Sequence, residues 1–337
     1  MFTRILVPLD GSGFAERALP HAEGFARVFG STIVLLQVLE TTEKINQPYA
    51  EDPITWVIRK NKAEQYLQET LAKVKERIDT EVSGVEYAIR TGNPAECIIS
   101  FAQDEGIDLL VISTHGWGGL THWNISSVAQ KVLHRIYLPV LLVRAYEELE
   151  TPESKIHYRR ILMPVDNSPR SECAFSACVR LIRKEDEGQS VTLPDKKSAE
   201  PVLFLATVIR PPEIPIPESH GEEAQELIAQ LMQLTRSSVL AYLERIRLQF
   251  PLPTEIRTIE NRSVSEALQN LVEEEGIDLI IMSAHGHTGH HHYPYGSVAR
   301  EMLEFGSRPI LIIQDVPRHL VRPSDSELAA NKIKGRV

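Results

Sequence analysis

The sequence predicts an α/β protein built from two tandem, doubly wound, parallel sheets of five strands each. Residues 4–10 read RILVPLD and residues 160–166 read RILMPVD, so that an opening strand occurs twice. In both halves, short apolar runs alternate with longer helical patterns, which indicates parallel strands joined by right-handed helical crossovers. Runs that are apolar throughout, such as residues 109–112, suit central strands covered on both faces.

Three further blocks repeat in the same order, which leaves little room for chance. Their offset is 156 residues at the start and 170 from residue 91 onward, so the second copy carries a net insertion of 14 residues. We place this insertion in the polar stretch 185–200 and expect it to form a surface loop. The matched blocks are residues 105–116 with 275–286, 127–129 with 297–299, and 138–143 with 308–313.

The first copy shows each element of this pattern. Asn93 and Pro94 predict a helix start, as an N-cap followed by proline, and Gly106 predicts the stop of that helix. The two long helices, near 54–80 and 222–249, each have one apolar face, and we expect their charged faces to be solvated. Expected strands are 4–9, 32–38, 85–90, 108–113 and 139–144, and expected helices are 14–29, 54–80, 94–104 and 127–136.

These patterns divide the chain into two domains, 1–146 and 156–316. The polar segment 147–155, which contains Pro152, is the expected hinge. Residues 317–337 are polar and basic, and we expect them to form a loosely ordered tail.

The composition excludes several classes of function. A net charge of −10 argues against a general nucleic-acid binder and against adhesion to an anionic membrane. No segment has the length of a membrane span and no secretory signal opens the chain, so a cytoplasmic protein is expected. Cys97, Cys173 and Cys178 lack CxxC spacing and indicate reduced, mostly buried thiols.

Polar residues follow the first and fourth strands of each copy. Asp10 and Asp166 end the first strands, and Gly116 and Gly286 follow the fourth. Ligands of open parallel sheets bind at these carboxyl ends. A carboxylate there accepts hydrogen bonds from a ribose or an adenine amine, whereas glycine lets backbone N–H groups approach a phosphate. The same residues also serve as turns and helix caps in proteins without a ligand.

The two copies differ where the next helix begins. Copy two has Gly296 and Ser297 at that point, whereas copy one has Ser126 and Ser127. If the site needs a positive φ, the Cβ of Ser126 costs about 1 kcal/mol. On these residues alone, copy two is the better anion site.

Together, these motifs resemble those of the universal stress protein family. Its ATP-binding signature is Gly-x-x-Gly, nine residues, then Gly-Ser/Thr, after an opening Ile-Leu-Val-Pro-x-Asp strand. Copy two matches from Ser283 to Ser297 with its first glycine replaced by serine, and copy one from Ser113 to Ser127 with two glycines replaced. The resemblance covers nearly the whole chain apart from the insertion and the tail, and the family includes members that do not bind ATP.

The resemblance implies an adenine nucleotide alpha hydrolase-like fold in which the two copies pair, with pseudo-twofold symmetry, through their last strands. It implies ATP, with or without Mg²⁺, as the ligand, and self-association within the chain while leaving a homodimer open. No catalytic or metal-binding residue is assigned. The implied nucleotide-binding residues are Pro164, Val165, Asp166, Val208, Met282, Ser283, Gly286, Gly296, Ser297 and Val298 in copy two, and Asp10, Val38, Gly116, Ser126, Ser127 and Val128 in copy one.

Two competing motifs carry less weight. Gly11-Ser12-Gly13 after the first strand, with Glu40 after the second, suggests a dinucleotide site, but Glu16 stands where its third glycine belongs. Residues 285–292 hold five histidines, a density that suits a metal, although no carboxylate or thiolate lies among them. We favour the interpretation that these residues form a solvated loop that covers the phosphate site. The histidines of such a loop would gain charge near pH 6.5.

The leading hypothesis is therefore a cytoplasmic stress-associated protein that binds ATP or another adenine nucleotide, better in copy two. A second hypothesis is a slow ATPase built on the same site, although His115 and His285 lack an evident catalytic partner. A third is a nucleotide-free interaction module, in which Ser113, Ser126 and Ser283 mark lost phosphate sites.

Overall fold

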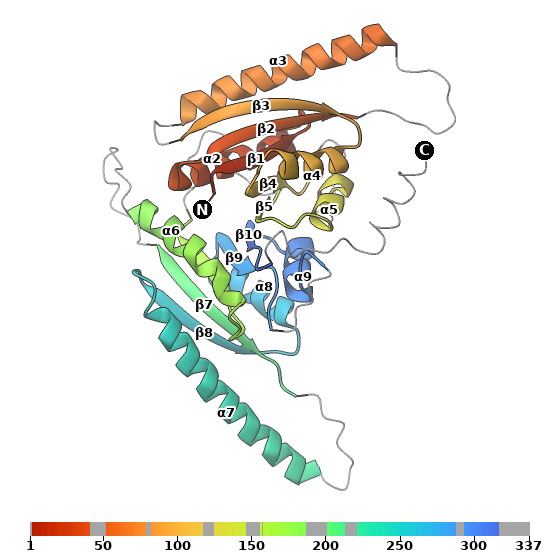
Figure 1. Cartoon of the computed structure of the whole chain (residues 1–337). Helices are drawn as coiled ribbons and strands as arrows, with labels where there is room; N and C mark the ends of the chain where they lie inside the picture. The colour runs from red at the N-terminus through yellow and green to blue at the C-terminus, as the bar shows by residue number, and fades with distance from the viewer. Residues whose placement is uncertain are drawn as a thin grey trace.

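The computed structural model describes residues 2–40, 52–78, 82–116, 125–145, 156, 158–186, 201–212, 221–287 and 293–316. Its strands form one twisted sheet in the order β3-β2-β1-β4-β5-β10-β9-β6-β7-β8 (Figure 1). Copy one supplies β1 (Arg4–Leu9), β2 (Thr32–Leu39), β3 (Gly84–Thr91), β4 (Leu109–Ser113) and β5 (Val140–Val143); copy two supplies β6 (Arg160–Pro164), β7 (Val202–Ile209), β8 (Thr254–Glu260), β9 (Leu279–Ser283) and β10 (Ile310–Ile313).

All strand pairs within each copy are parallel, whereas β5 and β10 pair antiparallel, with Leu141 opposite Leu311. The expected fold class and the pairing of the last strands are therefore confirmed. Arg144 strengthens this join, because its guanidinium donates to the carbonyl of Met302 (2.8 Å) and to that of Arg308 (3.3 Å) in the other copy.

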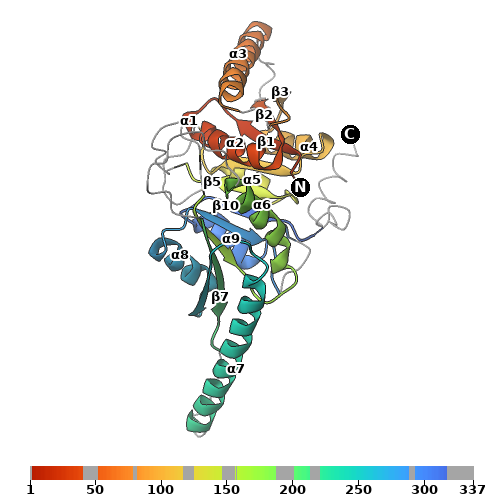
Figure 2. The same ribbon diagram turned by 90° about the vertical axis from the view of Figure 1, so that its left-hand side faces the viewer.

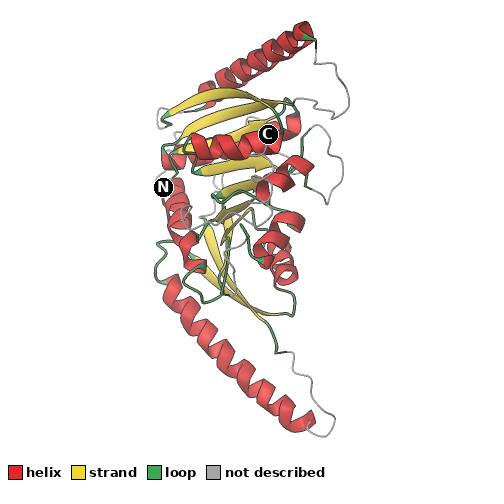
Figure 3. Ribbon diagram, turned by 45° about the vertical axis from the view of Figure 1, so that its right-hand side comes forward, coloured by secondary structure: helices red, strands yellow, loops and turns green. Residues whose placement is uncertain are grey.

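Helices cover both faces of the sheet (Figure 3). Alternate strand residues point to opposite faces, so Ile5 and Val7 enter one core and Leu6 the other. The first face carries α1 (Gly13–Glu16), α2 (Ala18–Phe29), α3 (Pro53–Arg77), η1 (Ser171–Ala174), α6 (Phe175–Asp186) and α7 (Gly221–Arg247); the second carries α4 (Pro94–Asp104), α5 (Ser127–Leu133), α8 (Val264–Glu274) and α9 (Ser297–Phe305).

Local signals set the limits of these helices. The Asn93 side chain accepts hydrogen bonds from the backbone N–H groups of Ala95 and Glu96, and Gly106 adopts a left-handed φ of 64° after α4. The expected single helix over 14–29 is wrong, because α1 ends before α2 begins. Pro20 lies in the first turn of α2, where its missing N–H is tolerated, whereas it would break a continuous helix.

Most of the expected connecting segments lie outside the described residues. This holds for the hinge at 147–155, the tail at 317–337 and residues 187–200 of the insertion. The domain boundaries therefore stay predictions. Residues 185 and 186, expected in the inserted loop, belong to the last turn of α6.

A buried contact ties copy one to the segment that precedes β6. His21 of α2 is fully buried and its Nδ1 lies 2.5 Å from the Tyr158 hydroxyl, while the Phe25 ring packs edge-on against Tyr158. Burial disfavours the charged imidazole and lowers the pKa of His21 to about 3. His21 therefore holds this contact in its neutral form.

This burial predicts that stability depends on pH. An unfolded chain binds a proton at His21 below about pH 6.5, which the folded chain does not bind until about pH 3. We expect the free energy of unfolding to fall as the pH is lowered through that window. In denaturant unfolding at several pH values, the free energy of unfolding of His21→Gln should fall less steeply with decreasing pH than that of the wild type. The matched control His134→Gln changes an exposed histidine and should leave the slope unchanged; equal slopes in all three proteins would contradict the account.

Candidate functional site

The predicted strand ends of copy one meet at the carboxyl edge of its sheet. Because β1 and β4 are parallel neighbours, Asp10 after β1 lies beside Gly116 after β4. One carboxylate oxygen of Asp10 accepts hydrogen bonds from the backbone N–H (2.9 Å) and the hydroxyl (2.6 Å) of Ser12. Ser12 in turn caps α1. Asp10 therefore fixes the turn that leaves the first strand.

Copy two repeats this arrangement. Asp166 accepts from the backbone N–H (3.1 Å) and hydroxyl (2.6 Å) of Ser168, and its second oxygen accepts from the backbone N–H of His287 (2.6 Å). A Cβ added to Gly286 would overlap the Asp166 carboxylate, as one on Gly116 would overlap Asp10. A larger residue at either position would therefore displace the aspartate carboxylate.

The glycines after β1 serve a turn. Gly11 has a left-handed φ of 82°, and Asn167 has a φ of 63° at the matching position of copy two. Glycine and asparagine are the residues that best tolerate this conformation. The turn after β1 therefore explains the glycine at position 11 of the Gly11-Ser12-Gly13 motif, and no bound dinucleotide is needed to explain it.

A cavity of about 480 Å³ opens at the carboxyl edge of copy one. This volume lies in the range of small-molecule sites. All six residues predicted for copy one line it: Asp10, Val38, Gly116, Ser126, Ser127 and Val128. Sequence reasoning missed the apolar side of the cavity, formed by Leu36, Pro94, Ile98 and Ile112. The apolar face of the helix predicted at 94–104 was a usable signal for Pro94 and Ile98. It does not show that this face lies against the ends of the strands that carry Leu36 and Ile112.

The predicted residues of copy two lie at the equivalent edge, and several are buried. Val165, Met282 and Ser283 are each less than 8% exposed, so their side chains belong to the core. The Ser283 hydroxyl donates to the carbonyl of His285 (2.7 Å). Asp166 and Gly286 lie in contact, whereas Pro164 and Val208 are half-buried at or near the ends of β6 and β7, and Gly296, Ser297 and Val298 begin α9.

The predicted backbone penalty at Ser126 is wrong. Ser126 has φ −56° and ψ 151°, and Gly296 has φ −68° and ψ 170°, so neither position needs a left-handed conformation. Both are helix N-caps, for which serine is a favoured residue. The Ser126 hydroxyl accepts from the backbone N–H of Ala129 (3.2 Å). The preference for copy two loses this support and stays a prediction.

The two histidines after the fourth strands are buried. In copy two, Nδ1 of His285 lies 2.7 Å from a carboxylate oxygen of Asp315 and Nε2 lies 2.8 Å from the carbonyl oxygen of Tyr293. Both ring nitrogens are engaged, so His285 holds the loop after β9 against the segment after β10. In copy one, His115 Nδ1 lies 3.0 Å from the Thr114 hydroxyl, and His115 lines the cavity.

The remaining motifs are only partly described. Residues 288–292, with three of the five clustered histidines, lie outside the described part of the chain, and within that part no group of three or more His, Cys, Asp or Glu gathers as a metal site.

The three cysteines are free; Cys178 is buried, and Cys97 and Cys173 are half-buried. Burial raises the pKa of Cys173 to about 12. No helix among the described residues is long and apolar enough to cross a membrane.

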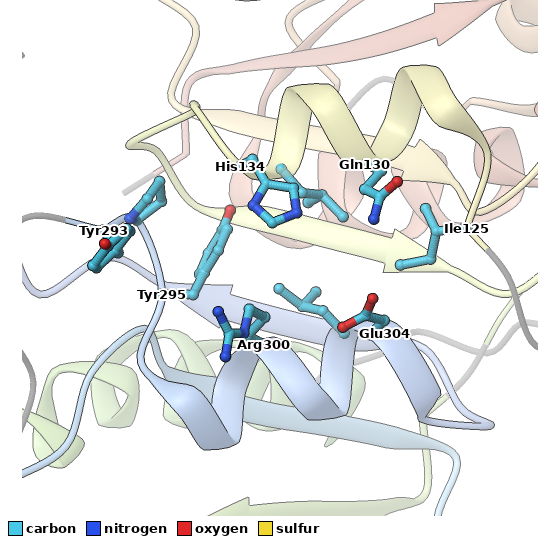
Figure 4. Close-up of a pocket in the computed structure, with 10 residues that line it drawn as sticks. Ile125, Gln130, His134, Tyr293, Tyr295, Arg300 and Glu304 are labelled. Carbon is cyan, nitrogen blue, oxygen red and sulfur yellow. The ribbon is translucent and has the colours of Figure 1, made fainter. Parts of the chain in front are cut away.

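A second, smaller hollow lies between the two copies, where α5 faces α9 (Figure 4). Its volume is about 50 Å³, room for a few water molecules. Tyr295 extends toward His134 across it, while Gln130 and Arg300 lie on its two helices. It contains none of the predicted site residues.

Comparison with known proteins identifies the family that has this architecture. The model of the family described as "Universal stress protein family" matches residues 1–144 and again residues 157–314. The chain belongs to the universal stress protein family. A universal stress protein of Methanocaldococcus jannaschii is 30% identical over 156 residues, which cover 43% of this chain and 96% of that relative. One of Thermus aquaticus is 32% identical over 145 residues, 43% of this chain and all of the relative. Each such relative matches the length of one copy.

Solved structures agree with the tandem fold. A universal stress protein of Archaeoglobus fulgidus superposes with a TM-score of 0.59 at 16% identity, covering 93% of this chain and 98% of its own. A Pseudomonas aeruginosa protein superposes with a TM-score of 0.54 at 15% identity, covering 100% and 98%. At this identity the likeness shows the fold alone.

The contact between Gly116 and Asp10 yields a prediction. Gly116→Ala should destabilise the protein by about 1–3 kcal/mol, because its Cβ forces the carboxylate aside. In an Asp10→Ala background the obstruction is gone, so the same change should cost less. Gly13→Ala is the control, since a Cβ there meets open space. Denaturant unfolding measures all three costs, and an equal cost of Gly116→Ala in both backgrounds would refute the contact.

Proposed function

We propose that this universal stress protein binds an adenine nucleotide in the cavity of copy one. The supporting observation is the cavity of about 480 Å³ at the carboxyl ends of β1, β2 and β4, lined by all six residues that the family signature implies for that copy. Ligands of open parallel sheets bind at this edge.

The lining suits the parts of a nucleotide. Leu36, Val38 and Ile98 offer apolar surface to an adenine ring, and the carboxylates of Asp10 and Glu40 accept hydrogen bonds from an amine or from ribose hydroxyls. Ser126 and Ser127 offer hydroxyl groups to phosphate oxygens. None of the described residues that line the cavity is a lysine or an arginine. We therefore propose ATP together with Mg²⁺, since the cation offsets the charge of phosphates beside two carboxylates.

The equivalent edge of copy two is the alternative site. Its Gly296 and Ser297 keep the signature more fully than Ser126 and Ser127 do. However, the backbone gives Gly296 no advantage over Ser126, and the cavity of about 480 Å³ lies at the edge of copy one. We therefore rank copy one first, which reverses the order that the sequence suggested.

A stress-related role in the cytoplasm is part of the same proposal and is supported by family membership alone. Slow ATP hydrolysis is a weaker candidate, since His285 is engaged on both nitrogens and His115 already has a hydroxyl at Nδ1. ADP accumulation in the binding samples would reveal it.

Isothermal titration with ATP, with and without Mg²⁺, tests the proposal. Binding with a stoichiometry near one per chain, stronger with Mg²⁺, is expected. Absence of binding to ATP, ADP, AMP and adenosine alike would overturn it and leave a nucleotide-free interaction module.

A matched pair of variants assigns the copy. Val38→Trp fills the adenine end of the copy-one cavity and should weaken binding by about tenfold or more, a loss of at least ~1.4 kcal/mol. Val208→Trp makes the equivalent change at the matching half-buried position of copy two and should leave the affinity unchanged. The opposite pattern would move the site to copy two.

A further inference from the structure

The two long helices begin well beyond the sheet that supports them. None of the described side chains in residues 53–62 of α3 is buried, and the first buried residue is Ala63. In α7, none of the described side chains in residues 221–227 is buried, Ile228 packs partly buried against the core, and Met232 is the first buried residue. At 1.5 Å per residue, the α3 overhang is about 15 Å long and the α7 overhang before Ile228 is about 10 Å long. Figure 2 shows α7 extending away from the body of the protein.

Exposed leucines form a stripe that begins in the α7 overhang and continues past the first residues that pack on the core. Leu227, Leu231 and Leu234 are 64%, 47% and 70% exposed. Their spacing of four and three residues places them on one side of the helix, as in a coiled-coil seam. This side is distinct from the one that packs on the sheet through Met232 and Val239. Several exposed leucines on one side of a helix are typical of an interaction site.

The overhang of α3 carries a matching apolar surface. Ile54, Val57 and Ile58 are 69%, 48% and 49% exposed, and their spacing of three and four residues also puts them on one side of the helix. Neither overhang has a partner element within the described chain that buries these residues.

The charges of the two overhangs are opposite. Arg59, Lys60 and Lys62 are the charged residues between Pro53 and Lys62, whereas Glu222, Glu223 and Glu226 are those between Gly221 and Leu234. Two α7 overhangs side by side would bring like charges together, and so would two α3 overhangs. When an α3 overhang pairs with an α7 overhang, the two apolar sides meet and the basic residues of α3 lie near the glutamates of α7.

We propose that the α3 overhang of one molecule packs on the α7 overhang of a second copy of this chain. Both overhangs point to the same side of the molecule, the right-hand side of Figure 1. A twofold axis on that side brings α3 of each copy against α7 of the other, so the dimer closes with two equivalent contacts. This interface is separate from the β5–β10 join and does not depend on nucleotide binding.

Sedimentation velocity of the full chain across micromolar concentrations tests the dimer. Wild-type protein should sediment as a dimer that weakens with added salt. Leu231→Glu combined with Leu234→Glu should weaken dimerisation by about tenfold or more without lowering stability, because both side chains are exposed. Leu240→Glu is the control, since Leu240 is exposed on α7 but is not part of the leucine stripe.

Charge exchange tests the choice of partner. Lys60→Glu with Lys62→Glu should weaken the dimer, and so should Glu223→Lys with Glu226→Lys. All four changes in one chain should restore it, because each contact again joins opposite charges. A monomeric wild type, a dimer indifferent to the leucine changes, or a failure of the fourfold variant to recover would each overturn the proposal. Circular dichroism verifies that every variant is folded.

Discussion

The antiparallel pairing of β5 with β10 is the interaction on which the rest of the structure depends. Each copy alone would expose its last strand as an apolar edge, open to pairing with other chains. The pairing of Leu141 with Leu311 covers both edges and merges two sheets into one. Because the two strands run in opposite directions, the carboxyl ends of β4 and β9 remain separate, and each copy keeps its own strand-end site. Arg144 and the His21–Tyr158 contact fix the same arrangement from either side.

Within each copy, one close contact shapes the candidate site. The carboxylate after the first strand lies directly against a glycine after the fourth, in both copies. This contact holds the two strand ends together and leaves the ends of β2 and the start of α4 to wall the copy-one cavity. The same aspartate therefore has a structural role in the turn, whether or not it also meets a ligand. The protein combines a hydrogen-bonded strand edge with a hollow large enough for a nucleoside.

Much of the fold was readable from the sequence because its signals are local. Asn93, Pro94 and Gly106 predicted the limits of α4 correctly, and the apolar runs of copy one, with their repeat in copy two, predicted the strands. The pairing of the last strands was implied by the resemblance to the family and is confirmed. The split between α1 and α2 was missed because the apolar residues of both helices follow one continuous helical period. That period does not show that Pro20 lies in the first turn of a second helix. The supposed need for a left-handed residue at Ser126 and Gly296 was wrong, because sequence alone does not distinguish an N-cap from a glycine turn. Periodicity indicated one apolar face for each long helix, but it does not show that the sheet ends before the helix does. The apolar wall of the cavity needed the tertiary arrangement, since it joins residues from β2, β4 and α4.

The central claim is that an adenine nucleotide occupies the cavity of copy one, and a crystal structure grown with ATP and Mg²⁺ tests it most directly. The account predicts density for an adenine ring against Val38 and for phosphates beside Ser126 and Ser127. An empty copy-one cavity in crystals whose copy two holds the nucleotide, or whose two copies are both empty, would contradict it.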